Sequence, residues 1–204
     1  MRLCFSLLIP LLAAPPPAAA QTPAVETGWH LGGGVDALRF GHVAVSDAEA
    51  GAAAAKVRPS GRAGLRLSVG RTAGPWDVSL EAGWAEGEIE IGNDVLSVRD
   101  LTSDVTRYRL TLAVGHRLTT LGTGGLGVEL APTVDVWSVT GSSRPRAGAE
   151  GRLVLRLPLG AVELENRIGV GLSGSPIEAS DLGQVAEERG LWTFLVGLGL
   201  RTSL

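Results

Sequence analysis

The stretch Arg107–Leu118, with the sequence RYRLTLAVGHRL, decides the fold because apolar and polar residues alternate along it. Successive side chains of a β-strand point to opposite faces, so this period of two predicts a strand. One face carries the apolar residues Tyr108, Leu110, Leu112, Val114 and Leu118. The other face carries the arginines 107, 109 and 117 with small residues between them. The predicted strand is therefore apolar on one face and cationic on the other.

Seven further segments show the same alternation. With the first, the predicted strands are Gly28 to Phe40, Gly61 to Arg71, Trp76 to about Glu86, Arg107 to Leu118, about Gly125 to Val139, about Gly151 to Leu159, Val162 to Leu172 and Leu191 to Leu204. No helical layer is left to cover eight apolar faces, and a lipid-facing sheet must close to satisfy its backbone hydrogen bonds. The connections after the second, fourth and sixth strands are short and the others are longer, as in outer-membrane barrels. The sequence therefore predicts an all-β fold, an eight-stranded antiparallel up-and-down transmembrane β-barrel with short periplasmic turns and longer extracellular loops.

The amino-terminal segment predicts secretion. Met1 and Arg2 begin an apolar stretch that reaches Leu12, and a run of small residues continues to Ala20. A positive start, an apolar middle and a small-residue cleavage site are typical of a signal peptide, and the stretch is shorter than the roughly 20 residues that a membrane-spanning helix needs. We expect a signal peptide at residues 1–20, a barrel domain at residues 21–204 and localisation in the outer membrane of a Gram-negative cell envelope. Cys4, the one cysteine of the chain, would leave with the signal peptide, so no disulfide is expected.

Composition excludes several other classes of protein. The formal net charge is −3, and no basic cluster suggests nucleic-acid binding. After residue 20 no apolar run approaches the ~18 residues of a transmembrane helix, which argues against a helical inner-membrane protein. No cluster of ligand residues predicts a metal ion, and no cofactor is expected.

The charges on the inward faces alternate in sign from strand to strand, so neighbouring strands can pair them. The residues expected to form interior ion pairs are Arg62, Arg66, Glu81, Arg107, Arg109, Glu129, Asp135, Arg152, Arg156, Glu163 and Glu165. A turn between Ala73 and Gly74 predicts Arg66 opposite Glu81, and a turn at Gly160 and Ala161 predicts Arg156 opposite Glu165. Glycines 32, 34, 197 and 199 leave space on the first and last strands, for Arg62, Arg201 or water.

The fifth predicted strand departs from the alternation at two positions. Pro132 and Trp137 interrupt the alternation of the fifth strand, and a proline inside a strand predicts a bulge there.

The remaining aromatic residues fall into two groups near the strand ends, which is typical of belts at the two membrane interfaces. Trp29 and Trp76 form the periplasmic group, while Trp84, Tyr108 and Trp192 form the group near the loops.

The chain resembles the small outer-membrane β-barrel family typified by the OmpA transmembrane domain and OmpX. The resemblance rests on the signal peptide, the eight alternating strands and the interior of arginines and carboxylates. The resemblance covers nearly all of residues 21–204. It implies a monomer that contacts outer-membrane lipids and the barrel-assembly machinery, with an extracellular partner for the loops that the sequence does not name. Such barrels typically end in an aromatic residue, whereas this chain ends in Leu204.

The expected function is structural or surface-interactive. An eight-stranded barrel is just wide enough to be filled by its own side chains, so we interpret the inner charges as a plug that sets the strand register. A narrow, porin-like channel for ions or small solutes is the alternative. A lipid-modifying enzyme ranks below it, because none of His30, His42 and His116 has a serine placed for activation, and we expect no enzyme. A soluble barrel of lipocalin type, with the apolar face inside, is the rival fold.

Overall fold

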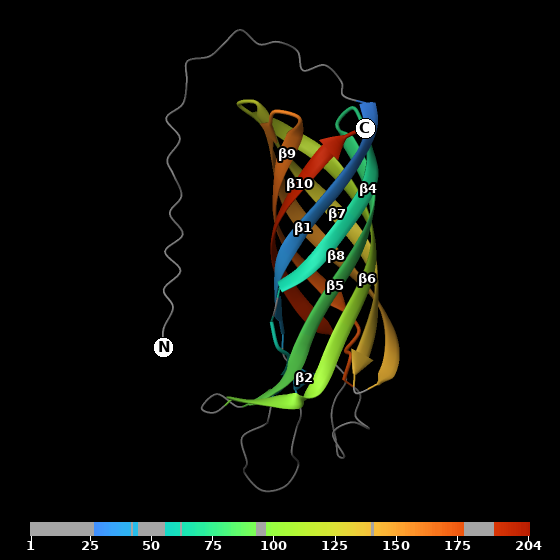
Figure 1. Cartoon of the computed structure of the whole chain (residues 1–204), viewed down its shortest axis with the longest axis vertical. Coiled ribbons are helices and arrows are strands. Elements are labelled where there is room, and N and C mark those ends of the chain that lie inside the picture. Colours follow the sequence, from blue (N-terminus) through green and yellow to red (C-terminus); the bar gives the residue numbers. More distant parts are fainter. Residues whose placement is uncertain are drawn as a thin grey trace, which may run out of the picture.

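A computed structural model describes residues 27–41, 43–44, 56–61, 63–92, 97–139, 141–177 and 190–204. The expected signal peptide, Arg62, His42 and most of the first and fourth loops lie outside these residues. Within them the structure consists of strands and tight turns (Figure 1). In the described part of the chain, no helix has the length and hydropathy that a membrane crossing requires.

Eight long strands close into a ring in which every neighbour is antiparallel. They are β1 (Thr27–Phe40), β4 (Ala63–Ala73), β5 (Trp76–Gly92), β6 (Ser97–Leu121), β7 (Gly124–Val139), β8 (Ser142–Leu159), β9 (Val162–Ser173) and β10 (Leu191–Ser203). Each strand pairs with the next around the ring, and β1 pairs with β10 to close it. Two short strands, β2 (Val43–Ala44) and β3 (Lys56–Pro59), extend the sheet beyond β1 and β4 through the pairing of β3 with β5. The expected eight-stranded up-and-down barrel is confirmed.

The two ends of the barrel differ. At one end, called the turn end, β4–β5, β6–β7 and β8–β9 are joined by two-residue turns. Each of these turns begins with a glycine of positive φ, namely Gly74, Gly122 and Gly160, a conformation that favours residues without a side chain. Thr27 and Leu204 also lie at this end, which is at the top in Figure 1. The opposite end, where β5–β6 and β7–β8 extend, is called the hairpin end.

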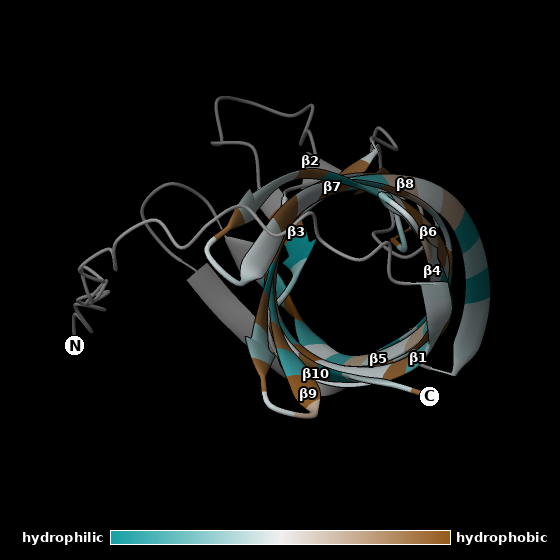
Figure 2. Ribbon diagram, turned by 90° about the horizontal axis from the view of Figure 1, so that it is seen from above, coloured by the Kyte–Doolittle hydropathy of each residue, from teal (hydrophilic) through white to brown (hydrophobic). Residues whose placement is uncertain are grey.

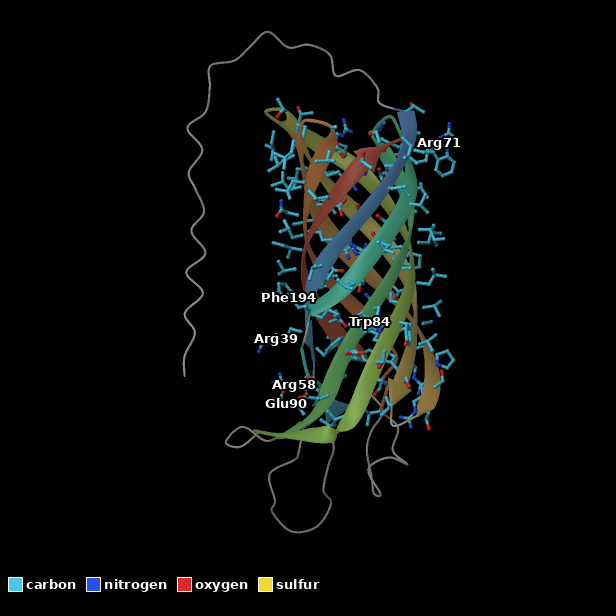
Figure 3. The ribbon with its side chains drawn as sticks, in the orientation of Figure 1. Arg39, Arg58, Arg71, Trp84, Glu90 and Phe194 are labelled. Carbon is cyan, nitrogen blue, oxygen red and sulfur yellow. The ribbon has the colours of Figure 1, made fainter. Side chains whose placement is uncertain are left out.

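The apolar residues of the strands face outward. Leu67 on β4, Leu112 on β6 and Leu198 on β10 are each about half exposed or more, while Arg66 and Thr111 next to two of them are buried. Seen along the barrel axis, the strands form a closed ring (Figure 2), and side chains project outward along the whole length of the barrel (Figure 3). The space inside the ring is called the lumen. This parity is opposite to that of a soluble lipocalin-type barrel, which places apolar side chains inside.

The hairpin end is built differently from the expectation. β5 continues to Gly92 and β6 begins at Ser97, so these two strands form a hairpin that extends beyond the predicted strand ends at Glu86 and Arg107. A register shift at Glu88–Ile89 separates the outer part of this hairpin from the barrel. A long loop was expected after the fifth strand, with the sixth beginning near Gly151. That prediction is wrong, because β8 begins at Ser142 and stays paired with β7 up to Val139.

The predicted bulge at Pro132 is also wrong. Pro132 faces outward and pairs with Ala149 in an unbroken register between β7 and β8. On the other side, the register between β6 and β7 is the same before and after it. The shift between these two strands lies instead between Arg117 and Thr119, near the turn end. An outward-facing proline, which has no backbone N–H to donate, is accommodated here without the extra residue of a β-bulge.

Candidate functional site: an ion-paired lumen

The lumen is filled by charged side chains that alternate in sign around the ring. Acidic residues come mainly from β1, β5, β7 and β9, and basic residues from β4, β6, β8 and β10; the buried members are Asp36, Arg66, Asp77, Glu81, Arg107, Glu129, Asp135, Glu150, Arg152, Glu165 and Arg167, and the partly buried ones are Arg109, Arg156, Glu163 and Arg201. Every carboxylate in this set lies within 4 Å of a guanidinium in the described residues. These contacts define the lumenal network.

Towards the hairpin end, the network centres on Asp135 of β7, which is fully buried. Arg107 donates two hydrogen bonds of 3.0 Å to its carboxylate. Arg109 donates two more, of 2.6 and 3.0 Å, and also contacts Glu150. Glu150 accepts in turn from Arg152. One carboxylate therefore binds two neighbouring guanidinium groups of β6 by bidentate bonding, which is the strong form of this interaction, and Glu150 supplies a second negative charge at Arg109.

In the middle of the barrel, the contacts cross the lumen. Arg152 of β8 lies 2.7 Å from Glu81 of β5, and Arg167 of β9 lies 3.2 Å from the same carboxylate. Arg167 also forms a bidentate pair with Asp36 of β1. Since β5 stands apart from β8 and β9 in the ring, these side chains fill the space between the walls.

Two register predictions have different outcomes. Arg156 lies opposite Glu165, as the Gly160 turn predicts, and donates a hydrogen bond of 3.2 Å to it. Arg66 was expected opposite Glu81 and instead lies opposite Gly83, because the turn residues are Gly74 and Pro75, so the register prediction was wrong by two residues. The two side chains still approach each other diagonally, at 3.8 Å.

Glycines create the space that the charged side chains occupy. Around one level of the barrel, successive cross-strand partners are Gly83, Arg66, Gly34, Gly199, Glu165, Arg156 and Gly125. Arg66 reaches across β1 and β10 to Glu165, at 2.9 Å. A Cβ atom at Gly34 or Gly199 would lie about 3 Å from the Arg66 Nη2 atom. The space predicted at Gly34 and Gly199 is therefore filled by Arg66, and the space at Gly197 by Asp36 and Arg167. At Gly32 the nearest side chains are those of Ser68 and Arg201.

An apolar cluster closes the lumen at the hairpin end. It consists of Phe40, Val105, Trp137, Val139 and Leu191, with Leu38 and Ile89 packed against it. Phe40 and Trp137 meet edge to face at 5.5 Å, and the Arg107 guanidinium lies 5.5 and 5.1 Å from their rings. The ionic network thus ends under an aromatic cover that adds cation–π attraction. Sequence reasoning missed this cluster, although Trp137 shares the inward parity of Thr133 and Asp135.

The other aromatic residues face outward at two levels. Trp29 and Trp76 lie at the turn end, opposite Arg71 and Ala73 of β4, while Trp84 pairs with Tyr108 further along β5 and β6. Trp192 is the second residue of β10, at the hairpin end. All five side chains are exposed. Their two levels match the two interface groups expected from the sequence.

The two described histidines, His30 and His116, do not form a pair of nucleophile and base with a described serine or threonine. His30 is buried at the turn end, with Nε2 3.3 Å from Asp77. The Thr72 hydroxyl nearby donates to Asp77 at 2.9 Å rather than to the imidazole. His116 packs edge-on against Trp76 on the outer face. Among the described residues, no group of three or more His, Cys, Asp or Glu side chains is arranged to hold a metal ion.

Replacing Asp135 by Asn should lower the free energy of unfolding by about 3–5 kcal/mol, since it removes the negative charge that binds the buried Arg107 and the partly buried Arg109. Glu163→Gln is the matched control. Glu163 lies at the rim, about one third exposed and 3.4 Å from Arg201, so its loss should cost less than about 1 kcal/mol. Denaturant titration of both variants in lipid vesicles measures the difference, and equal costs would contradict a stabilising role for the lumenal network.

Comparison with known proteins supports the architecture. No protein-family model and no curated protein matches the chain. Solved structures similar to it include Neisserial surface protein A (12% identity, TM-score 0.56, 87% of this chain and 97% of that one) and the outer membrane protein OprG from Pseudomonas aeruginosa (13%, 0.57, with the same coverage of both). The outer membrane protein AlkL, solved in lipid bilayers, is 13% identical with a TM-score of 0.55 over 94% of this chain and 97% of that one. At these identities the likeness shows the fold, and the chain accordingly has the fold of the small outer-membrane β-barrel proteins.

Proposed function

We propose that this chain is a monomeric outer-membrane protein that spans the bilayer as a sealed barrel and presents its hairpin end outside the cell. The signal peptide expected at residues 1–20 would direct it there. The belt of exposed leucines and valines supports the membrane location, because so much contiguous apolar surface is not tolerated in water. The turn end would then face the periplasm, as short turns do in this fold.

The observation that carries the proposal is the closure of the lumen. Arg152 and Arg167 reach across to Glu81, and above them Phe40 and Trp137 cover Arg107. A conducting path would need a continuous column of water, and these contacts occupy the barrel cross-section at several levels. We therefore favour a role as a membrane anchor over a narrow channel.

Side-chain hydrogen bonds stabilise the hairpin end, as a surface that binds an extracellular partner would require. Arg58 of β3 and Glu90 of β5 form a bidentate pair at 3.0 Å outside the barrel ring, and both labels lie at that end in Figure 3. On the opposite side of the ring, Arg144 and Arg146 of β8 donate to the carbonyl oxygens of Pro176 and Ser175. These bonds hold the extended hairpins in fixed positions, and binding sites are commonly carried by loops on such scaffolds.

In planar bilayers, the purified full chain should give no stable current steps at high salt, because the lumen is filled. Insertion is checked separately by flotation of the protein with the same lipids in a density gradient. Regular unitary steps from inserted protein would contradict the sealed barrel and favour the narrow channel.

Cysteine labelling in intact cells tests the orientation. Ser142→Cys is placed in the β7–β8 hairpin, and Ala161→Cys is the control in the turn after β8; both positions are exposed. A membrane-impermeant maleimide should label Cys at position 142 in whole cells and Cys at position 161 only after lysis. The reverse pattern, or no difference between the two, would overturn the proposed display role.

A further inference from the structure

The turn end of the lumen contains a cavity of about 390 Å³. It is lined by Arg117, Arg156, Arg201, Asp77 and Glu163, and by the glycine-rich segment 122–127. Small-molecule sites typically have volumes of about 300–1,000 Å³, with a few convergent polar groups. The cavity lies at the end opposite to the apolar cluster and apart from the hairpins, so the proposed display role does not use it.

Arg117 differs from the other two arginines of this cavity. Arg156 lies 2.7 Å from Glu129 and 3.2 Å from Glu165, and Arg201 lies 2.8 Å from Asp77. The Arg117 side chain has no ion pair or hydrogen bond within the part of the chain that the structure describes, although it lines the same cavity. One guanidinium at the cavity therefore keeps its full capacity to bind an anion.

The backbone places Arg117 at this position. Its N–H donates to the Pro75 carbonyl at 2.7 Å, just beyond the last pair of β5 and β6. The register of β6 against β7 shifts between Arg117 and Thr119. Such irregularities re-aim side chains and are common beside functional sites. The shift comes directly after Arg117, which still faces the cavity, while Leu118 is exposed on the outside.

The segment opposite Arg117 consists of glycines and a threonine, with Leu126 as its one large residue. Gly122, Gly124, Gly125 and Gly127 line the cavity with Thr120 and Thr123. The side chain of Arg117 lies over Gly125, where an added Cβ would come within 3.5 Å of its Cδ and Nε atoms. With no larger side chain between them, the guanidinium and the hydroxyl groups border one open space.

We propose that this turn-end cavity binds a small soluble anion through a carboxylate or phosphate group, with Arg117 as the residue that contacts it. The planar guanidinium binds both groups in a bidentate manner. Arg156 and Arg201 add positive potential, while their carboxylate partners keep them in place. The ligand comes from the aqueous phase, because the three arginines face the lumen and the strand walls separate them from lipid.

Titration of the 15N-labelled full chain with inorganic phosphate, in a phosphate-free maltoside detergent at constant ionic strength, tests the proposal. The amide signals of glycines 122, 124, 125 and 127 should shift saturably in the millimolar range. Arg117→Gln should weaken the affinity by about tenfold or more, the loss of one charge-assisted contact. Arg117→Lys keeps the charge but lacks the planar guanidinium group. Its phosphate affinity should lie between that of the unchanged chain and that of Arg117→Gln.

Arg71→Gln is the matched control. Arg71 lies near the turn end on β4 and points away from the lumen (Figure 3), so this change removes the same charge without touching the cavity and should leave the phosphate affinity unchanged. Absence of a saturable shift, or equal affinities for Arg117→Gln and the unchanged chain, would overturn the proposal. Heat-dependent mobility on gels verifies that each variant is folded.

A second arm distinguishes the source of the anion. In nanodiscs of phosphatidylcholine and of phosphatidylglycerol, the phosphate-induced shifts should be the same. If phosphatidylglycerol alone moves the four glycine signals and phosphate then has no effect, the ligand is a lipid headgroup and the assignment to a soluble anion is wrong.

Discussion

A charged side chain enclosed in a membrane-embedded cylinder must meet an opposite charge, because leaving it unpaired away from water costs several kcal/mol. This constraint orders the lumen. Its acidic and basic residues come from alternate strands, so each wall of the barrel offers a partner to the next. Asp135, which binds both Arg107 and Arg109, shows how tightly the requirement is met. The same contacts fix the strand register, since a shift by one residue would turn every charge towards lipid.

Room for these pairs comes from glycine. A barrel of eight strands has little interior volume, and several long arginine side chains lie over positions that carry no side chain. Arg66 crosses two strands over Gly34 and Gly199 to reach Glu165. Gly169 lies beside Arg152 and Gly171 beside Glu150 in the same way. Many of the 29 glycines of the chain thereby serve the packing of charge, rather than flexibility.

The fold followed from the sequence because a period of two is a strong local signal, and the outward parity of residues such as Leu112 needs no long-range knowledge. The strand register beyond the turns is harder to predict. The turn near Gly74 was predicted at the wrong position, so Arg66 was assigned the wrong cross-strand partner. Glu150 escaped notice because β8 begins earlier than its hydropathy indicates. Trp137 looked like a break in the pattern, although it marks where the lumen changes from ionic to apolar filling. Contacts across the lumen, such as Arg152 with Glu81, join residues far apart in sequence and leave no local signal.

Tryptophan fluorescence in brominated lipid tests the orientation of the side chains most directly. Of the five tryptophans, Trp137 is buried in the lumen, while Trp84 is exposed on the outer face. Two variants, each keeping one of these tryptophans and replacing the others by Phe, should respond differently. The account predicts strong quenching of Trp84 by bromine atoms on the acyl chains and little quenching of Trp137. Strong quenching of Trp137 with a protected Trp84 would contradict an ionic lumen and an apolar exterior.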